Sequence, residues 1–227
     1  MKKYQIKEKS KILSRFFKTG PGQYSEGDVF LGLKTAETRT VAKKYSEICL
    51  PDIAKLLASK IHEYRSAAII ILTHRFKKAN LAGKKEIYKF YLKNISGINN
   101  WDLVDSSAHK IIGAYLDVSG DSKQILYKLA KSNDLWKKRI AIISTYHFIR
   151  KKEFEDALKI SKILLNDEHD LIHKAVGWML REVGNRNMPA EERFLKKYYQ
   201  KMPRTMLRYA IEKFPETKRQ SYLKGSA

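Results

Sequence analysis

Apolar residues recur at helical spacing along almost all of this 227-residue chain, and this pattern constrains the fold more than any other feature. Between residues 84 and 94, for example, Ile87, Phe90 and Tyr91 fall on one helical face and lysines fall on the other. The sequence shows no sustained alternation of apolar and polar residues, and no Asn-Gly or Asp-Gly hairpin turn. It therefore predicts an all-α fold.

Short polar turns separate about a dozen predicted helices, and a glycine-rich loop at 20–27 follows the first of them. Helix pairs of about 35–45 residues are typical of HEAT-like and armadillo-type solenoids, whose concave face is a binding surface. We therefore predict a single α-helical repeat domain over residues 1–227, with a globular helical bundle as the alternative fold. Helices are expected at 4–17, 36–44, from 51, 61–78, 84–94, 101–116, 121–131, 135–149, 152–165, 170–181, 190–200, 204–214 and near 222.

Three of these helices have recognisable N-terminal caps. Thr35, Asp121 and Asp134 each precede an apolar periodic segment, and side chains of these types accept hydrogen bonds from the first free N–H groups of a helix. We predict that these residues cap the helices that follow them.

Charge restricts the classes of function. Forty-six Lys and Arg residues against 24 Asp and Glu give a formal net charge of +22. Such an excess is usually retained because a polyanion neutralises it. Nucleic acid is the first candidate, an anionic membrane surface the second, and a basic protein without such a partner the third. No apolar run approaches the roughly 20 residues of a membrane span, so no membrane segment is expected.

Motifs for cofactors and metals are absent. Cys49 is the single cysteine, which excludes an internal disulfide and fits a reducing compartment. No apolar signal region follows Met1, so we expect a cytoplasmic location. His169 and His173 have a ligand-compatible spacing but lack a third ligand nearby, so no metal site is predicted. Phosphate-binding loops, dinucleotide motifs and nucleophile elbows are also missing, and no cofactor is expected.

The three tryptophans each lie near a charged residue, in the pairs Trp101–Asp105, Trp136–Arg139 and Trp178–Arg181. On a helix, the four-residue spacing of the first pair places the ring and the carboxylate on one face. Core packing is the ordinary role of a helical tryptophan, but the polar residues around Trp101 argue against it there. Aromatic faces between cations suit nucleic acid, because rings stack on bases or sugars while cations hold phosphates.

A second basic feature lies near the end of the chain. Residues 196–219 are rich in Lys and Arg, and Arg204 and Arg208 share a helix face. This stretch could hold phosphates, or it could be an ordinary solvated basic surface.

Five segments together resemble the AlkD family of alkylpurine DNA glycosylases, in order along nearly the whole chain. They are the loop Gly20–Gly27 leading to Phe30–Gly32, Trp101–Asp105, Trp136–Arg139, Gly177–Glu182 and Met202–Tyr209. The resemblance implies a C-shaped stack of HEAT-like repeats with a basic concave face that holds duplex DNA. It also implies that no cofactor is required.

By the same resemblance, Asp105 would be the catalytic carboxylate, and Trp101 and Trp178 would form aromatic walls beside the damaged nucleotide. Arg139 would be a cation on the phosphate side, and Trp136 would serve in packing. The DNA-binding residues expected from these motifs and from the basic stretch are Tyr24, Arg181, Arg204 and Arg208.

The implied activity is hydrolysis of the N-glycosidic bond of N3- or N7-alkylated purines, such as 3-methyladenine and 7-methylguanine, in duplex DNA. The enzyme would be monofunctional and monomeric, would not flip the base, and would act in base excision repair on a bacterial-type nucleoid. Two alternatives stay open. One is a non-catalytic HEAT-like protein that binds damaged or branched DNA, and the other is a helical scaffold for protein interactions.

Overall fold

The computed structural model describes Met1 and residues 5–226, and helices make up most of this part of the chain. Over these residues no β-strand forms, although an isolated parallel bridge pairs Val29 with Ile61. The predicted all-α fold class is therefore confirmed. The predicted start of the first helix at Tyr4 lies outside the described residues.

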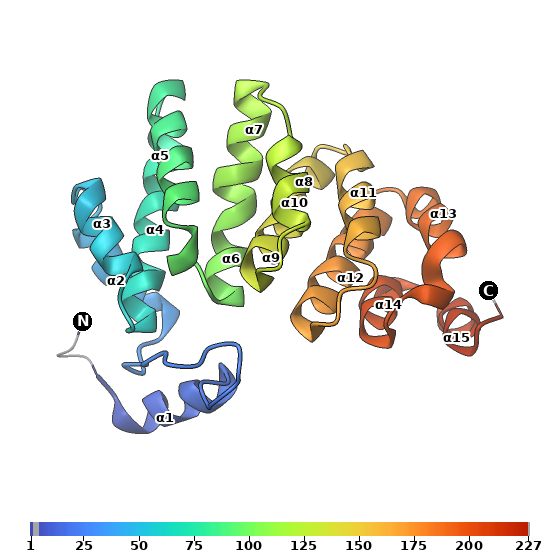
Figure 1. Cartoon of the computed structure of the whole chain (residues 1–227), viewed down its shortest axis with the longest axis horizontal. Coiled ribbons are helices and arrows are strands. Elements are labelled where there is room, and N and C mark those ends of the chain that lie inside the picture. Colours follow the sequence, from blue (N-terminus) through green and yellow to red (C-terminus); the bar gives the residue numbers. More distant parts are fainter. Residues whose placement is uncertain (2–4, 227) are drawn as a thin grey trace. The chain divides into compact units, whose positions relative to one another are not determined.

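The chain divides into two compact units, Met1–Ser107 and Ala108–Ala227. Each unit is built from helices that follow one another along the chain (Figure 1). The single repeat domain expected over residues 1–227, its C shape and its basic concave face stay predictions.

Helix α4 is the centre of the first unit. Its segment Ala67–Leu72 is wholly apolar, and all of these side chains except Ile70 are buried in a helix that packs against α2, α3 and α5. Figure 1 shows α4 and α5 side by side. The elements of this unit are α1 (Lys7–Phe16), α2 (Thr35–Lys44), α3 (Leu50–Leu57), α4 (His62–Lys78), α5 (Leu81–Lys93), the 3₁₀ turn η2 (Ile95–Gly97) and α6 (Trp101–Ala108), whose last residue begins the second unit.

A buried carboxylate fixes the segment between α1 and α2. Glu63 accepts hydrogen bonds from the backbone N–H groups of Leu31, Gly32 and Leu33, at 2.9–3.3 Å. Gly32 has a φ of +86°, and a Cβ there would lie 2.4 Å from the carbonyl oxygen of Ile6. A residue without a side chain is therefore required where α1 comes against this segment.

Helix α12 has the corresponding central place in the second unit, where it packs on α9, α13 and α14. Most of its residues between Ile172 and Gly184 are buried. The elements are the π-helical turn η3 (His109–Gly113), α7 (Ala114–Ser119), α8 (Gln124–Ala130), α9 (Leu135–Ser144), α10 (Tyr146–Arg150), α11 (Glu155–Ile163), α12 (Asp170–Gly184), α13 (Met188–Tyr198), η4 (Tyr199–Lys201), α14 (Arg204–Ala210), η5 (Ile211–Lys213) and α15 (Glu216–Lys224).

One of the three predicted caps is confirmed. Asp134 accepts hydrogen bonds from the N–H groups of the first turn of α9. Thr35 is instead the first residue of α2, and the Glu37 carboxylate accepts the backbone N–H of Lys34 at 2.6 Å. Asp121 lies before the start of α8 and accepts a hydrogen bond from the Tyr115 hydroxyl at 3.0 Å, so the prediction that it caps the helix was wrong.

Candidate active site

Trp101 and Asp105, the predicted wall and carboxylate, both lie on α6 and are half-buried. Their spacing of four residues places them on one face of that helix, as predicted. Leu103 and Val104 lie between them and are fully buried, which fixes α6 to the core. At the start of the helix, the side-chain oxygen of Asn100 accepts the backbone N–H of Trp101 at 2.8 Å.

Trp101 lies at the end of a column of aromatic rings. The Phe17 ring stacks on its indole, with centroids 5.2 Å apart and an interplanar angle of 16°. Phe30 stacks on Phe17 in turn, and the imidazole of His62 stacks on Phe30 at 4.6 Å. Phe16 meets the indole edge-on at 5.9 Å. The ring predicted to form one wall of the cleft is therefore held by packing from α1 and α4.

A buried network of charges ties the start of α6 to α4. His62 Nε2 lies 2.8 Å from a carboxylate oxygen of Asp102, and its Nδ1 lies 3.7 Å from Asp28. Arg65 pairs with Asp28 at 2.5 Å. Burial opposes the charged imidazole, but the bonds to Asp102 and Asp28 outweigh it and raise the pKa of His62 above its ordinary value. Asp102, the neighbour of Trp101, is thus hydrogen-bonded to a buried imidazole of α4.

The opposite side of α6 meets α5 through a hydroxyl pair. The hydroxyls of Tyr91 and Ser107 lie 2.8 Å apart and are buried. Burial raises the pKa of Tyr91, and the negative charge of Asp105 adds to this rise, while the bond to Ser107 opposes it.

Tyr24 lies in the glycine-rich loop, which is non-helical as predicted, and is half-buried. The next residue, Ser25, is buried, and its hydroxyl accepts a hydrogen bond from the Asn100 amide at 2.6 Å. Because the Asn100 side chain also accepts the backbone N–H of Trp101, this bond fixes the loop carrying Tyr24 to the helix carrying Trp101 and Asp105.

In the second unit, Trp178 is half-buried on α12 and is oriented by an acid one turn later. Its indole N–H donates to Glu182 at 3.2 Å, and Arg186 pairs with the same carboxylate at 2.7 Å. The Tyr146 ring lies 5.9 Å from the indole, and the Arg186 guanidinium lies 5.7 Å from the Tyr146 centroid. The second predicted wall therefore belongs to a cluster of two rings and an ion pair.

The predicted cations differ in exposure. Arg139 is 5% exposed, and its guanidinium donates a hydrogen bond to the carbonyl of Leu171 at the start of α12. Arg181 is mostly buried and pairs with Glu212. To bind phosphate directly, Arg139 would have to use guanidinium N–H groups other than the one bonded to Leu171.

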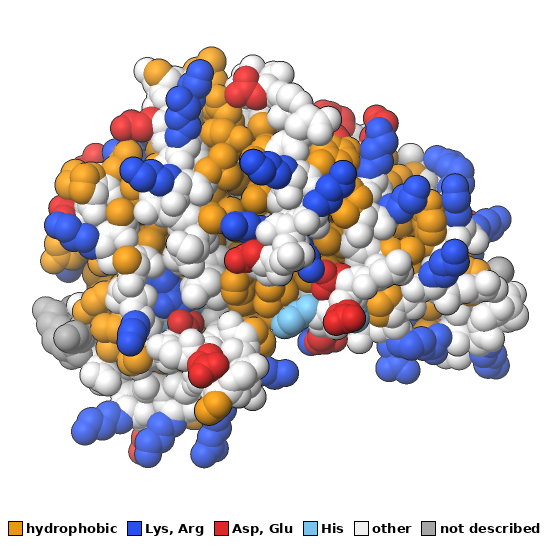
Figure 2. Space-filling model, viewed as in Figure 1, with side chains coloured by type: hydrophobic (Ala, Val, Ile, Leu, Met, Phe, Trp, Pro, Cys, Tyr) orange, Lys and Arg blue, Asp and Glu red, His pale blue; other side chains and the backbone are white. Residues whose placement is uncertain are grey.

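Arg204 and Arg208 are both exposed on α14, one turn apart, as the sequence predicted. Arg204 also donates to the carbonyl of Leu223 at 2.9 Å. Figure 2 shows Lys and Arg side chains spread over the visible face, with fewer acidic groups among them. Their role in binding DNA stays a prediction.

Tyr24, Trp101 and Asp105 are grouped in the first unit by the contacts above, whereas Arg139, Trp178, Arg181, Arg204 and Arg208 belong to the second. That the two groups act on one nucleotide stays a prediction. Sequence reasoning missed the residues that hold the predicted ones in place, because most of these contacts join distant parts of the chain. These residues are Phe17, Asp28, His62, Arg65, Asp102, Tyr146, Glu182 and Arg186.

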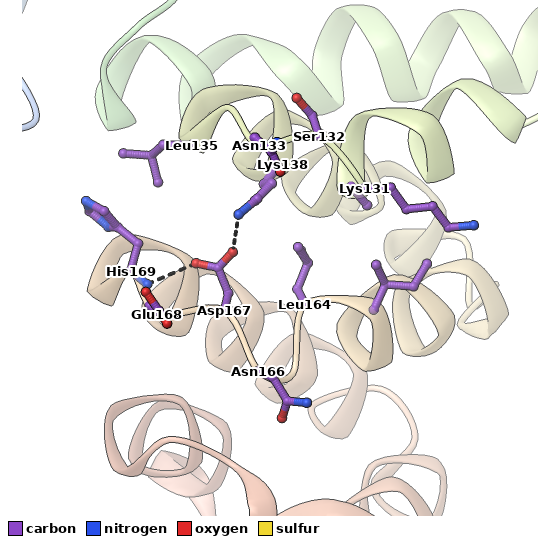
Figure 3. A pocket seen from close by; sticks show the side chains of 12 residues that line it. Lys131, Ser132, Asn133, Leu135, Lys138, Leu164, Asn166, Asp167, Glu168 and His169 are labelled. Carbon is purple, nitrogen blue, oxygen red and sulfur yellow. Dashed lines mark hydrogen bonds and ion pairs between the residues drawn. The ribbon is translucent and has the colours of Figure 1, made fainter.

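A cleft of about 710 Å³ lies elsewhere in the second unit, between the loop that precedes α9 and the loop that precedes α12 (Figure 3). Two of the charged groups that line it bond to each other. Lys138 donates to Asp167 at 2.6 Å, and the backbone N–H of His169 donates to the same carboxylate at 2.9 Å. None of the predicted site residues lines this cleft, so we do not place the chemistry there.

The described part of the chain contains no group of three or more His, Cys, Asp or Glu side chains arranged to hold a metal ion. None of its helices combines the length and apolar character needed to cross a membrane.

Residues 1–214 match the family model described as DNA alkylation repair enzyme. The chain belongs to this family. Membership assigns it to the repair of alkylation damage and implies that it binds DNA. No curated protein matches the chain.

Solved structures of similar proteins support the same fold. One is described as a predicted DNA alkylation repair enzyme from Enterococcus faecalis, with 16% identity and a TM-score of 0.70, covering 93% of this chain and 97% of that one. AlkD2 from Streptococcus mutans and smu.31 from Streptococcus mutans UA159 each share 19% identity with a TM-score of 0.54, covering 91% of this chain and 98% of theirs. These similarities confirm the predicted helical-repeat fold class of the DNA alkylation repair enzyme family.

Proposed function

We propose that this family member is a monofunctional DNA glycosylase, which hydrolyses the N-glycosidic bond of N3- or N7-alkylated purines in duplex DNA without flipping the base. It would act as a cytoplasmic monomer in base excision repair. Asp105 is the proposed catalytic carboxylate, Trp101 and Trp178 are the aromatic walls, and Arg139 is a cation on the phosphate side.

One observation carries the proposal. A half-buried indole and a carboxylate share one face of α6 in a chain of net charge +22 that belongs to an alkylation repair family. A carboxylate near a polyanion is unfavourable unless it meets a positive charge there. The part-buried bonds of Asn100 and Asp102 hold the start of α6 in place, and such support is expected for a catalytic group rather than for a chance surface acid.

The chemistry needs little beyond this pair. A purine alkylated at N3 or N7 is already cationic, so it can leave without protonation by a general acid. The bond between C1′ and the base nitrogen breaks, and its electron pair neutralises the departing base. Water then adds to C1′ and loses a proton. Positive charge develops on the sugar in the transition state, as in other glycosidic cleavages, and Asp105 would stabilise it and orient the water.

The tryptophans would contribute by the faces of their rings. An indole face attracts a nearby cation by about 1–2 kcal/mol when water is excluded. No lysine is required as a nucleophile in this scheme, because water attacks the sugar. Release of the base should therefore leave an abasic site with the DNA strand intact.

The decisive experiment compares Asp105→Asn with the wild type on methylated duplex DNA. We expect the variant to lose at least about a hundredfold in the release of 7-methylguanine and 3-methyladenine, since electrostatic stabilisation of this kind typically contributes that much. DNA binding should survive. Asp52→Asn is the matched control, because Asp52 on α3 has a side chain that is 50% exposed and pairs with Lys55 alone among cationic side chains in the described chain.

Chromatography of the released bases and a gel that detects strand breaks are the two readouts. Near-normal excision by Asp105→Asn would refute the role of Asp105. A wild-type protein that binds methylated duplex but releases no base would instead make this chain a non-catalytic DNA-binding member of the family.

A further inference from the structure

Helix α1 exposes its apolar face. None of its ten residues is buried, and Ile12 and Phe16 are 65% and 61% exposed. These are the largest exposures among the large apolar side chains of the described residues. The two side chains are one turn apart and therefore lie on the same face. Exposing two large apolar side chains to water is unfavourable, so we interpret this face of α1 as a surface that contacts another molecule.

The exposure does not come from loose attachment of α1. The backbone N–H of Ile6 donates to the carbonyl of Leu31 at 2.9 Å, and the Ser10 hydroxyl donates to that of Phe30 at 2.6 Å. Phe17, directly after the helix, is buried within the aromatic column. One side of α1 is thus fixed to the unit by main-chain contacts while Ile12 and Phe16 stay outside.

Phe16 also connects this face with the candidate site. Its ring contacts the Trp101 indole edge-on, with centroids 5.9 Å apart, and meets Phe17 at 5.1 Å and 88°. Trp101 is half-buried and Phe16 is exposed, so Phe16 extends the aromatic surface outward from the proposed cleft wall.

Cations surround the exposed apolar pair. Lys11, Arg15 and Lys18 are exposed on or just after α1, and no carboxylate of the described residues pairs with them. Basic side chains stand out along the edge of the molecule where α1 lies in Figure 1 (Figure 2). Cations around an apolar wedge match duplex DNA, where phosphates take the cations and bases or sugars take the rings.

We propose that Ile12 and Phe16 form a wedge that contacts duplex DNA next to the nucleotide beside Trp101, while Lys11, Arg15 and Lys18 hold the neighbouring phosphates. The proposal extends the proposed function and rests on it for the position of the damaged nucleotide. An apolar side chain pressed against a base step partly unstacks it, and the step costs less where a damaged base already stacks poorly. The wedge therefore favours damaged over intact sites.

The test measures binding rather than excision. Wild type, Phe16→Ala, Phe16→Tyr and Leu81→Ala are titrated by fluorescence anisotropy against a duplex with a tetrahydrofuran abasic-site analogue and against the intact duplex. Leu81 is the matched control, since it is 55% exposed on α5 of the same unit. We expect Phe16→Ala to weaken binding of the abasic duplex about tenfold, because stacking on an aromatic side chain contributes on this scale.

The intact duplex should lose less affinity in Phe16→Ala, while Phe16→Tyr and Leu81→Ala should bind as the wild type does. The thermal unfolding of Leu81→Ala and Phe16→Tyr should be unchanged, and the unfolding temperature of Phe16→Ala should fall only slightly, because its largely exposed ring loses contacts with Trp101 and Phe17. Wild-type affinity of Phe16→Ala for the abasic duplex overturns the proposal.

Two other binding partners of this face, a second copy of the chain and a membrane, would each give a different experimental result. If the wild type is a dimer that Phe16→Ala converts to a monomer with DNA binding intact, the face binds a second copy of the chain. If Phe16→Ala loses only binding to vesicles of anionic phospholipid, the face binds a membrane. Either result overturns the wedge.

The failure of the wedge and of the glycosylase can be told apart. If the wild type excises methylated bases and Phe16→Ala binds and excises equally well, the wedge is wrong and the glycosylase stands. If the wild type releases no base but Phe16→Ala loses affinity for the abasic duplex, the wedge stands and the glycosylase is wrong.

Discussion

The close packing of α12 against α14, next to Trp178, can be tested by a single substitution. Gly177 immediately precedes Trp178 on α12, and α14 packs against it. A Cβ at this position would lie 2.4 Å from the carbonyl oxygen of Met206 and 2.5 Å from the Cβ of Tyr209. Ordinary contacts between such atoms are about 3.5 Å, so Gly177→Ala must push the two helices apart by about 1 Å.

The expected cost follows from two opposing terms. Overpacking against a backbone atom that cannot rotate away should cost about 3 kcal/mol, the upper end for an added methyl group. Alanine is preferred over glycine within a helix by about 1 kcal/mol, which offsets part of this cost. We therefore expect Gly177→Ala to lower the free energy of unfolding by about 2 kcal/mol, or roughly 30-fold in the unfolding equilibrium.

Urea unfolding followed by circular dichroism measures this loss. The midpoint should fall while the denaturant slope stays unchanged, because the same surface is exposed on unfolding. Gly83→Ala on α5 is the control. A Cβ there would meet a methyl group of Ala79 at 3.0 Å, which a small shift relieves, so its midpoint should stay constant or rise. If Gly177→Ala unfolds at the wild-type midpoint, α12 and α14 do not pack as described and the reasoning is refuted.

Two buried ionisable groups make stability depend on pH in measurable ways. Burial raises the pKa of Glu191 from 4.5 to about 9, so between these pH values the folded state holds a proton that the unfolded chain releases. The free energy of unfolding should therefore fall by about 1.4 kcal/mol for each unit by which the pH rises within this range. The urea midpoints of Glu191→Gln should lack this dependence on pH. Burial lowers the pKa of His62, but Asp102 and Asp28 outweigh it and raise that pKa. The contribution of His62 to the free energy of unfolding should therefore be complete below about pH 6.5, and it should disappear as the pH rises through the pKa of His62 in the folded state. His62→Gln should remove that contribution, and a variant with the same pH profile as the wild type would argue against the charged imidazole.

The sequence was informative about α6 because the evidence there is local. Helical periodicity placed Trp101 and Asp105 on one face, and this placement needs only the 3.6-residue repeat. The bond from His62 to Asp102 spans 40 residues, and the bond from Asn100 to Ser25 spans 75. Such pairs depend on how the helices stack, which no local pattern records.

Local rules also failed where two local interactions competed. Thr35 is a good N-cap by residue type, but Glu37 bonds to the backbone of Lys34 and moves the start of α2 one residue earlier. Asp121 has an alternative partner in the Tyr115 hydroxyl, and α8 begins three residues later. In contrast, Glu182 lies one turn after Trp178, and its bond to the indole N–H could have been predicted from that spacing.

The contacts of Trp101 and Trp178 are consistent with their proposed role of attracting a cationic sugar. A ring attracts a cationic sugar through its face, where the π electrons lie, rather than through its edge. Phe17 covers one face of Trp101, and the indole keeps partial exposure. The Trp178 N–H is bonded to Glu182, whose charge is offset by Arg186, so this acid is occupied by two partners. Asp102 is likewise occupied by His62. Glu182 therefore orients the Trp178 ring through its bond to the indole N–H, while Asp102 joins the start of α6 to α4.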